Sequence, residues 1–325
     1  MGVVGSAGGS WRLLGDVGGT NARFALQAGS GMEPEALVQY RCADFESLQA
    51  ALQHYLAEPG RPQPQHGAIG IANPIDGDQV RMTNHDWQFS IEALRQGLGL
   101  KRLLFLNDFA ALALALPTLR PDELRPVGGG MAVAGAPLAL LGAGTGLGVS
   151  GLMPSKAGPD QVISGEGGHV TLAPADDEEA AVVDWLRRRF GHVSAERALS
   201  GQGLENLYRA WAALHGHAVE ELSAAQISAR ALQHSDPTCD AALELFLSLL
   251  GNVAGNLALT LGALGGVYIG GGIVPRLGAR IDDSRFRQRF EQKGRFADYL
   301  SRIPVSVIQP GGEPSLRGAA RALDA

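Results

Sequence analysis

The stretch Asp16-Val17-Gly18-Gly19-Thr20-Asn21-Ala22-Arg23 combines small residues with a carboxylate in a way that suits phosphate chemistry. Glycines lack side chains, so backbone amides can approach phosphate oxygens closely, and Thr20 can add a hydroxyl donor. Asp16 ends an apolar run beside the expected phosphates, where a carboxylate can hold magnesium directly or through water. We therefore expect a magnesium-nucleotide site here. For the two glycines alone an ordinary hairpin turn is the simpler interpretation, which the flanking Asp16 and Arg23 weaken.

Two further glycine loops repeat this pattern later in the chain. Gly142-Ala143-Gly144-Thr145-Gly146-Leu147-Gly148 lies between two apolar runs and could hold the other side of the phosphates. Gly270-Gly271-Gly272 follows a strand-like run, and its openness suits an adenine or ribose lying against backbone. The sequence lacks a Gly-Lys-Ser/Thr phosphate loop, and Leu147 stands where a dinucleotide fingerprint needs its last glycine. NAD binding and P-loop hydrolysis are therefore disfavoured.

A third feature is the pair Asn107-Asp108, which follows the strand predicted at 101–106 and precedes a helix rich in alanine and leucine that ends before Pro117. A carboxylate at the end of a strand can orient a hydroxyl group and accept its proton. The same two residues could instead simply cap the following helix. The local sequence leaves both interpretations open.

The elements that carry these loops alternate between strand and helix patterns, which is typical of α/β architecture. A length of 325 residues exceeds one ordinary core of roughly 150 residues, so we expect two domains. We predict a first lobe of residues 1–116 plus 309–325 and a second of 117–308, with 117–137 as the crossover. Both lobes begin with a strand, a glycine turn and a strand, which suggests related halves.

Composition excludes several classes of function. The formal net charge is −6 and no basic stripe is present, so nucleic acid is an unexpected partner. Arg187, Arg188 and Arg189 follow acidic residues in the order that complements a helix dipole, and we interpret them as a solvated helix end. Cys42 and Cys239 cannot form a disulfide framework or a four-cysteine zinc site. Together with the absence of a signal-peptide pattern, this predicts a cytoplasmic protein.

The run 245–274 carries no charged residue and is long enough to cross a bilayer. However, Asn252, Asn256 and Thr260 recur at helical spacing, and Gly265-Gly266 divides the run into a helix and a strand. A buried helix followed by a core strand explains the pattern better than a membrane span.

Taken together, these motifs resemble those of the bacterial glucokinase family, within the superfold of hexokinase and actin-like ATPases. The resemblance extends over almost the whole chain after Trp11. It rests on 15–26, Met82-Thr83-Asn84-His85, 106–109, 142–149, Gly165-Glu166-Gly167-Gly168-His169, 194–203 and 265–275.

The resemblance implies a sugar-binding set of Asn107, Asp108, Glu166, His169 and Glu196, with Asp108 as the catalytic base. Asparagine, histidine and carboxylate side chains can bind paired sugar hydroxyls by two-point hydrogen bonds, which discriminate against missing or misplaced hydroxyls. Glu196 could otherwise be a surface carboxylate, and His169 a satisfied core histidine or a metal ligand.

The resemblance also implies an α/β, two-lobed ribonuclease H-like (actin-like ATPase) fold with a central cleft, and an ATP- and Mg²⁺-dependent homodimer that phosphorylates glucose in glycolysis. Another hexose or amino-sugar kinase of the same fold is the nearest alternative. A non-catalytic sugar-responsive regulator and an actin-like assembly protein are alternatives of another class, which Asp108 and the absence of a helix-turn-helix disfavour.

Overall fold

A computed structural model describes residues 10–83 and 85–325, and within them the chain divides into two compact units. Unit 1 comprises Met1–Leu119, Ala157–Val162 and Gly311–Ala325, and unit 2 comprises Arg120–Lys156 and Ile163–Pro310. The sequence alone places 157–162 in the second lobe. In the structure this segment packs with unit 1, where Arg321 Nη2 donates to Asp160 Oδ2 at 2.8 Å. The N-terminal residues before Ser10 and Asn84 of the Met82–His85 motif lie outside the described residues.

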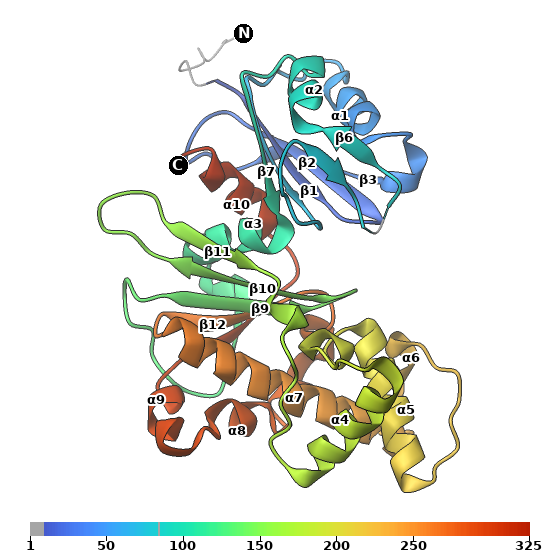
Figure 1. Ribbon diagram of the computed structural model, residues 1–325. Helices are drawn as coiled ribbons and strands as arrows, with labels where there is room; N and C mark the ends of the chain where they lie inside the picture. Colours follow the sequence, from blue (N-terminus) through green and yellow to red (C-terminus); the bar gives the residue numbers. More distant parts are fainter. Residues whose placement is uncertain (1–9, 84) are drawn as a thin grey trace. The chain divides into compact units, whose positions relative to one another are not determined.

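Unit 1 is built on a mixed sheet with the strand order β3-β2-β1-β4-β7 (Figure 1). β1 pairs antiparallel with β2, whereas β4 and β7 continue the sheet in parallel. This confirms the predicted hairpin around the first glycine loop. The strands are β1 (Arg12–Val17), β2 (Asn21–Gln27), β3 (Glu35–Arg41), β4 (His66–Ile71) and β7 (Arg102–Asn107), and a separate hairpin joins β5 (Gln79–Arg81) to β6 (Gln88–Ser90).

Helices cover both faces of this sheet: α1 (Leu48–Leu56) and α2 (Ile91–Gly97) on one, α3 (Asp108–Ala115) and α10 (Pro314–Ala322) on the other. Side chains alternate between faces along a strand. In β1, Leu13 and Val17 pack in the cluster with α1, whereas Leu14 packs against Leu316 of α10. Asp16 shares the parity of Leu14, so β1 presents it on the face covered by α3 and α10.

The closing helix α10 belongs to unit 1, where it contacts α3, β1 and β4. It packs so closely against α3 that only glycine fits at position 318. A Cβ there would stand 1.7 Å from the Ala111 carbonyl oxygen. Arg321 Nη1 donates to Leu114 O at 2.7 Å and Arg317 Nη1 to Thr118 O at 2.9 Å. Leu114 lies in the last turn of α3 and Thr118 ends the following 3-10 turn η2 (Leu116–Thr118), so both arginines satisfy carbonyls at helix ends.

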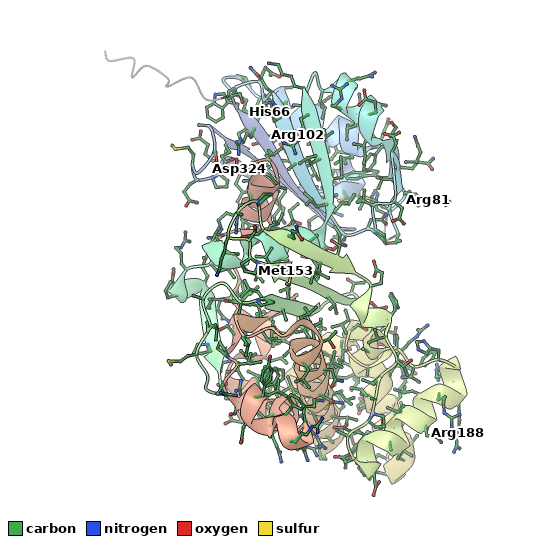
Figure 2. The ribbon with its side chains drawn as sticks, turned by 60° about the vertical axis from the view of Figure 1, so that its left-hand side comes forward. His66, Arg81, Arg102, Met153, Arg188 and Asp324 are labelled. Carbon is green, nitrogen blue, oxygen red and sulfur yellow. The ribbon has the colours of Figure 1, made fainter. Side chains whose placement is uncertain are left out.

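The C-terminus is also fixed to the opposite end of the sheet. Arg102 Nη1 donates to Leu323 O at 3.4 Å, and Arg12 Nη1 lies 2.7 Å from Asp324 Oδ1. Arg102 and Asp324 are labelled in Figure 2. Strands β1 and β7 therefore help to hold the helix that covers their Asp16-bearing face.

Unit 2 has a sheet with the order β11-β10-β9-β12-β13-β8. Counted along the chain from β9, its strands follow the same third-second-first-fourth-fifth order as those of unit 1, as the echo between the two halves suggests. β8, inside the predicted crossover 117–137, adds an antiparallel edge to β13 that sequence analysis missed. The strands are β8 (Leu124–Val127), β9 (Leu138–Ala143), β10 (Leu147–Met153), β11 (Gln161–Gly165), β12 (Gly266–Gly270) and β13 (Val305–Ile308).

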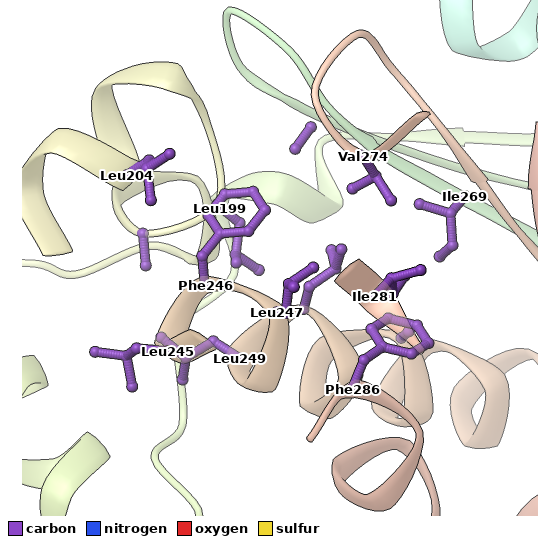
Figure 3. Packing of buried hydrophobic residues seen from close by; sticks show 14 of the residues in the cluster. Leu199, Leu204, Leu245, Phe246, Leu247, Leu249, Ile269, Val274, Ile281 and Phe286 are labelled. Carbon is purple, nitrogen blue, oxygen red and sulfur yellow. The ribbon is translucent and has the colours of Figure 1, made fainter. Parts of the chain in front are cut away.

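The core of unit 2 surrounds α7, from which Leu245, Phe246, Leu247 and Leu249 reach the packed cluster in Figure 3. This helix is long and apolar enough to cross a membrane by composition, yet 72% of its most apolar window is buried within the protein. The prediction of a buried helix feeding a core strand is confirmed. The helices of unit 2 are α4 (Asp177–Phe190), α5 (Gly201–His215), α6 (Ala224–Leu232), α7 (Pro237–Leu261), α8 (Phe286–Glu291) and α9 (Ala297–Ser301).

A buried polar network joins α4, α7 and α8. Glu179 is fully buried; its carboxylate accepts from Ser248 Oγ at 2.8 Å and lies 3.2 Å from Arg289 Nε. Arg289 also pairs with Asp176, the N-cap residue of α4. Because the two charges are paired and hydrogen-bonded, neither is left uncompensated in the core. Two acidic residues at the start of α4, Asp176 and Glu179, thus take part in this network.

The Gly318 contact predicts a specific loss of stability. Gly318→Ala should lower the free energy of unfolding by about 2 kcal/mol or more, because the new methyl group would overlap the Ala111 carbonyl. Alanine has the higher helix propensity, so a stabilising result would contradict this packing. Gly201→Ala is the control, since a Cβ there meets no atom closer than 3.7 Å, and urea denaturation of both variants makes the comparison.

Candidate active site

The first glycine loop is a tight turn held by the segment after β3. Gly18 N donates to Asn21 O at 2.9 Å, and Cys42 donates its backbone N–H to Thr20 O at 2.9 Å. The Cys42 thiol also donates to Gly18 O at 3.4 Å. Thr20 remains exposed. The loop is thus an ordinary hairpin turn in its backbone, with the Thr20 hydroxyl exposed beside it.

Asp16 ends up beside two other charged groups at the end of β1. Arg23 Nη1 lies 3.3 Å from Asp16 Oδ2 and 3.5 Å from Glu313 Oε2. Burial raises the pKa of Asp16, Arg23 lowers it, and Glu313 raises it. The carboxylate charge is therefore only partly compensated. A hard cation nearby would favour the ionised carboxylate, so the donor chemistry of Asp16 fits magnesium, which typically binds through one or two carboxylates, water and nucleotide phosphates.

Asp108 is brought near Asp16 by the register of parallel strands. Asp16 pairs with Gly70 across β1 and β4, and Gly70 pairs with Leu106 across β4 and β7. A Cβ on Gly70 would lie 3.1 Å from Ala111 Cβ and 3.8 Å from Asp108 Cα. Because Gly70 has no side chain, α3 can pack close to the sheet at this point.

In this position Asp108 is a weaker acid than an ordinary aspartate. Burial raises the pKa of Asp108 to about 6, and the charge of Asp16 adds to the increase. Hydrogen bonds from the Phe109 backbone and from Asn107 act in the opposite direction. Desolvation is therefore the dominant cause. At neutral pH the group is ionised and is more basic than an ordinary aspartate.

Asn107 serves as the N-cap of α3. Its Oδ1 accepts from Phe109 N at 3.0 Å and from Ala110 N at 3.3 Å, while Asp108 Oδ1 accepts from Phe109 N at 2.9 Å. The capping alternative therefore describes Asn107 correctly. It does not compete with a role for Asp108, because the cap fixes the first turn and with it the direction of the Asp108 side chain.

The second and third glycine loops meet at the ends of β9 and β12. Gly142 pairs with Gly270, and a Cβ on Gly142 would lie 2.4 Å from the Gly270 carbonyl carbon. Gly271 has a φ of +78°. Gly272 has no atom within 4 Å of a Cβ position, so its backbone stays open, as expected for a surface against which a nucleoside could lie.

The loop between β9 and β10 is closed by Gly144 N donating to Gly146 O at 2.8 Å. Gly144 O accepts from Gly201 N at 2.9 Å, which ties the loop to the start of α5. Thr145 is exposed at its tip. The loop is therefore anchored by backbone hydrogen bonds while its hydroxyl group remains available.

The Leu147 backbone contacts Glu196 on one side and the turn that carries Glu166 and His169 on the other. Leu147 N donates to Glu196 Oε2 at 2.9 Å, and a Cβ on Gly146 would lie 2.4 Å from that oxygen. On its other side, a Cβ on Gly168 would lie 2.1 Å from Leu147 O. Glu196 is thus half-buried and hydrogen-bonded, so the interpretation as a surface carboxylate is wrong.

Glu166 precedes and His169 ends the short turn η4 (Gly167–His169), which packs on β10. His169 N donates to Glu166 O at 2.9 Å, and both side chains are exposed. Ala195 N donates to Val170 O at 2.9 Å, which joins this turn to η5 (Ala195–Arg197) and so to Glu196. His169 is consequently not a core histidine.

The predicted residues thus form one group in each unit. Unit 1 holds Asp16, Gly18, Gly19, Thr20, Asn21, Asn107 and Asp108, and unit 2 holds Gly142, Gly144, Thr145, Gly146, Glu166, His169, Glu196, Gly271 and Gly272. Gly70, Glu313 and the Leu147 backbone are not among the residues predicted from the sequence. Gly70 and Glu313 carry no local motif, although Glu313 has an unusual φ of +43° for a residue with a side chain.

Comparison with known proteins gives a uniform result. A family model described as glucokinase matches residues 13–325. A glucokinase from Aromatoleum aromaticum is 56% identical over 314 residues, covering 96% of this chain and 94% of that protein. A glucokinase from Chromobacterium violaceum is 55% identical over 309 residues, covering 95% and 88%.

Solved structures agree with this. The crystal structure of a glucokinase from an Antarctic psychrotroph superposes with a TM-score of 0.89 at 39% identity, covering 97% of this chain and 99% of that one. A ROK family glucokinase from Streptomyces griseus in complex with glucose and AMPPNP has a TM-score of 0.63 at 19% identity, covering 96% and 99%. The latter shows the fold alone, and the predicted actin-like ATPase fold class is confirmed.

The coupling between the two carboxylates can be measured directly. Asp16→Asn should lower the pKa of Asp108 below about 6, because it removes a charge that raises it, while burial should keep the value above that of an ordinary aspartate. Carboxyl ¹³C NMR titration reports both values. Asp44→Asn, at an exposed site, is the control. An unchanged pKa of Asp108 in the Asp16 variant would show that the two carboxylates do not interact.

Proposed function

Because the chain belongs to the glucokinase family and is an ATP-dependent hexose kinase, we propose that it transfers the γ-phosphoryl group of ATP to the 6-hydroxyl of glucose with Asp108 as the base. The observation that carries the mechanistic part is the half-buried Asp108 carboxylate, whose pKa burial raises to about 6. A base of this strength is still ionised near neutral pH and accepts a proton better than an exposed aspartate.

In this mechanism Asp108 accepts a hydrogen bond from the sugar hydroxyl and takes its proton as the phosphorus-oxygen bond forms. The phosphoryl group passes directly to the sugar oxygen in line, so no covalent enzyme intermediate forms. Asn107 fixes the helix turn that directs Asp108, since its Oδ1 caps α3. Positioning accounts for most of the rate enhancement in such reactions, because the protein supplies little covalent chemistry.

We assign sugar recognition to Asn107, Asp108, Glu166, His169 and Glu196. Glu166 and His169 have exposed side chains on one short turn, which supports a role in binding ligand hydroxyls. Glu196 uses one carboxylate oxygen for the Leu147 amide, so its orientation is set before sugar binds. Preset hydrogen-bond groups reject a sugar that lacks the matching hydroxyl, because they are then left unpaired.

We assign nucleotide binding to the three glycine loops: Gly18, Gly19, Thr20 and Asn21 in the first, Gly142, Gly144, Thr145 and Gly146 in the second, and Gly271 and Gly272 in the third. The exposed Thr20 and Thr145 hydroxyls and the open Gly272 backbone support this assignment. Asp16 would hold Mg²⁺ through water, and the ion would neutralise charge on the transferring phosphates.

Glucose, rather than another hexose or amino sugar, is proposed because the similar proteins from Aromatoleum aromaticum and Chromobacterium violaceum are glucokinases. A glycolytic role, a homodimer and a cytoplasmic location complete the proposal, with no nucleic acid or membrane as a partner. The formal net charge of −6 supports the exclusion of nucleic acid.

The base assignment predicts a large kinetic defect. Asp108→Ala should lower kcat by at least about a hundredfold, the usual contribution of a positioned acid or base, while the fold is retained. Coupled detection of ADP release with magnesium-ATP and glucose, fructose, mannose, galactose, N-acetylglucosamine or N-acetylmannosamine measures both activity and substrate preference. Near-normal turnover in the variant would exclude Asp108 as the base, and a preference for another sugar would change only the substrate.

The raised pKa also predicts the acid limb of the pH profile. The ionised form of Asp108 fills as pH rises through about 6, so kcat/KM should be constant near neutral pH and fall about tenfold per unit below that value. The glucose-dependent rate between pH 4.5 and 8 tests this. A midpoint close to that of an exposed aspartate would show that the base is not the buried carboxylate.

A further inference from the structure

Unit 2 carries a polar cavity that none of the residues assigned above lines, although Arg197 in its lining directly follows Glu196. Its volume is about 560 Å³, within the range of roughly 300–1,000 Å³ typical of small-molecule sites. It lies between the end of α4, the turn η5 and the start of α5. One arginine from each element lines it: Arg189, Arg197 and Arg209. The lining also includes the side chains of Phe190, Asn206 and Glu221.

The arginines of this cavity differ in how they are compensated. Arg209 lies 3.6 Å from Glu205 and 3.1 Å from Glu221, two carboxylates that also line the cavity. Across residues 10–83 and 85–325, no ion pair involves Arg189 or Arg197. The cavity thus contains three guanidinium groups and two carboxylates. Arg209 pairs with both carboxylates, so the positive charges of Arg189 and Arg197 stay unpaired.

Both uncompensated arginines are arranged around one aromatic ring. Arg197 Cζ stands 4.5 Å and Arg189 Cζ 5.7 Å from the centroid of Phe190. Such contacts orient a guanidinium group and leave its edge donors free. Asn206 is buried and donates from Nδ2 to Arg197 O at 3.0 Å, which fixes the backbone that carries Arg197. The backbone that carries Arg197 is therefore fixed before any ligand arrives.

The simplest alternative is that these arginines only complement the C-terminal dipole of α4. Arg187 and Arg188 fit that description, because both pair with Asp184 on the exposed side of the helix. Figure 2 labels Arg188 on this outer surface. Arg189 is likewise exposed in the last turn of α4, as the interpretation of a solvated helix end predicts, but it lines the cavity as well.

We propose that this cavity binds a small phosphate-bearing molecule and that its occupancy changes the affinity for sugar. Guanidinium groups bind phosphate oxygens by paired, charge-assisted hydrogen bonds, and the stacked pair can supply them. Arg197 directly follows Glu196 in η5, and Glu196 holds the Leu147 amide. An anion that draws on Arg197 therefore acts one peptide away from an assigned sugar ligand. The second part rests on the proposed function, whereas the first does not.

Inorganic pyrophosphate is the probe for the first part. Isothermal titration of the full-length protein, without magnesium and with chelator, should show binding that Arg189→Gln/Arg197→Gln weakens at least tenfold. Arg188→Gln is the matched control and should bind as the unaltered protein does. Thr145→Val tests the competing anion site in the glycine loop. Loss of binding in this variant, with binding retained in the double arginine variant, would overturn the cavity assignment, as would no binding at all.

The coupling is tested by titrating glucose with and without saturating pyrophosphate. The glucose Kd should change at least threefold in the unaltered protein and stay constant in the double arginine variant. An unchanged Kd while pyrophosphate occupies the cavity would overturn the coupling. Pyrophosphate binding that depends on the arginines, in a protein that binds no glucose, would instead contradict the sugar assignment and leave the anion site standing.

Discussion

Close contacts at glycine residues determine the candidate site in both units. Gly70 leaves the space that α3 and Asp108 occupy beside β4, and Gly318 lets α10 lie directly on α3. In unit 2, Gly142 meets Gly270, and Gly168 meets the Leu147 carbonyl. A side chain at Gly318, Gly142 or Gly168 would overlap backbone atoms and push apart the elements that carry polar groups, whereas one at Gly70 would press on the Ala111 methyl group. Tight packing at the ends of the central strands therefore sets the positions of the charged groups. The same packing buries Asp16 and Asp108, which raises the pKa of each.

The two sheets show how one arrangement serves two purposes. Asp16 and Gly142 are the penultimate residues of β1 and β9, and each pairs with a glycine, Gly70 or Gly270, on the next parallel strand. In unit 1 the free space beside the glycine admits α3, and a carboxylate stands at the strand end. In unit 2 a second glycine takes the place of the carboxylate, and the strands approach so closely that two loops meet. The equivalent position thus carries charge in one unit and backbone in the other.

The Leu147 backbone connects residues that the proposed chemistry assigns to different ligands. Its amide holds Glu196, its carbonyl faces Gly168 in the turn of Glu166 and His169, and it ends the loop that contains Thr145. A shift in any one of these segments must therefore act on the others through this short stretch of strand. Such a shared element is the physical requirement for coupling between two ligands, because each can bias the same backbone position.

The sequence by itself determined the local features: the glycine loops between strands, the carboxylates at strand ends, the buried helix α7 and the α/β alternation. These follow from residue spacing and from the conformations that glycine and apolar residues favour over short stretches. Only the tertiary structure decided that Gly70 separates Asp16 from Asp108, that Glu313 reaches Arg23, that Asp160 binds Arg321 and that β8 completes the edge of a sheet. Those contacts join residues far apart in the chain, and strand register and helix packing, which no local pattern encodes, bring them together.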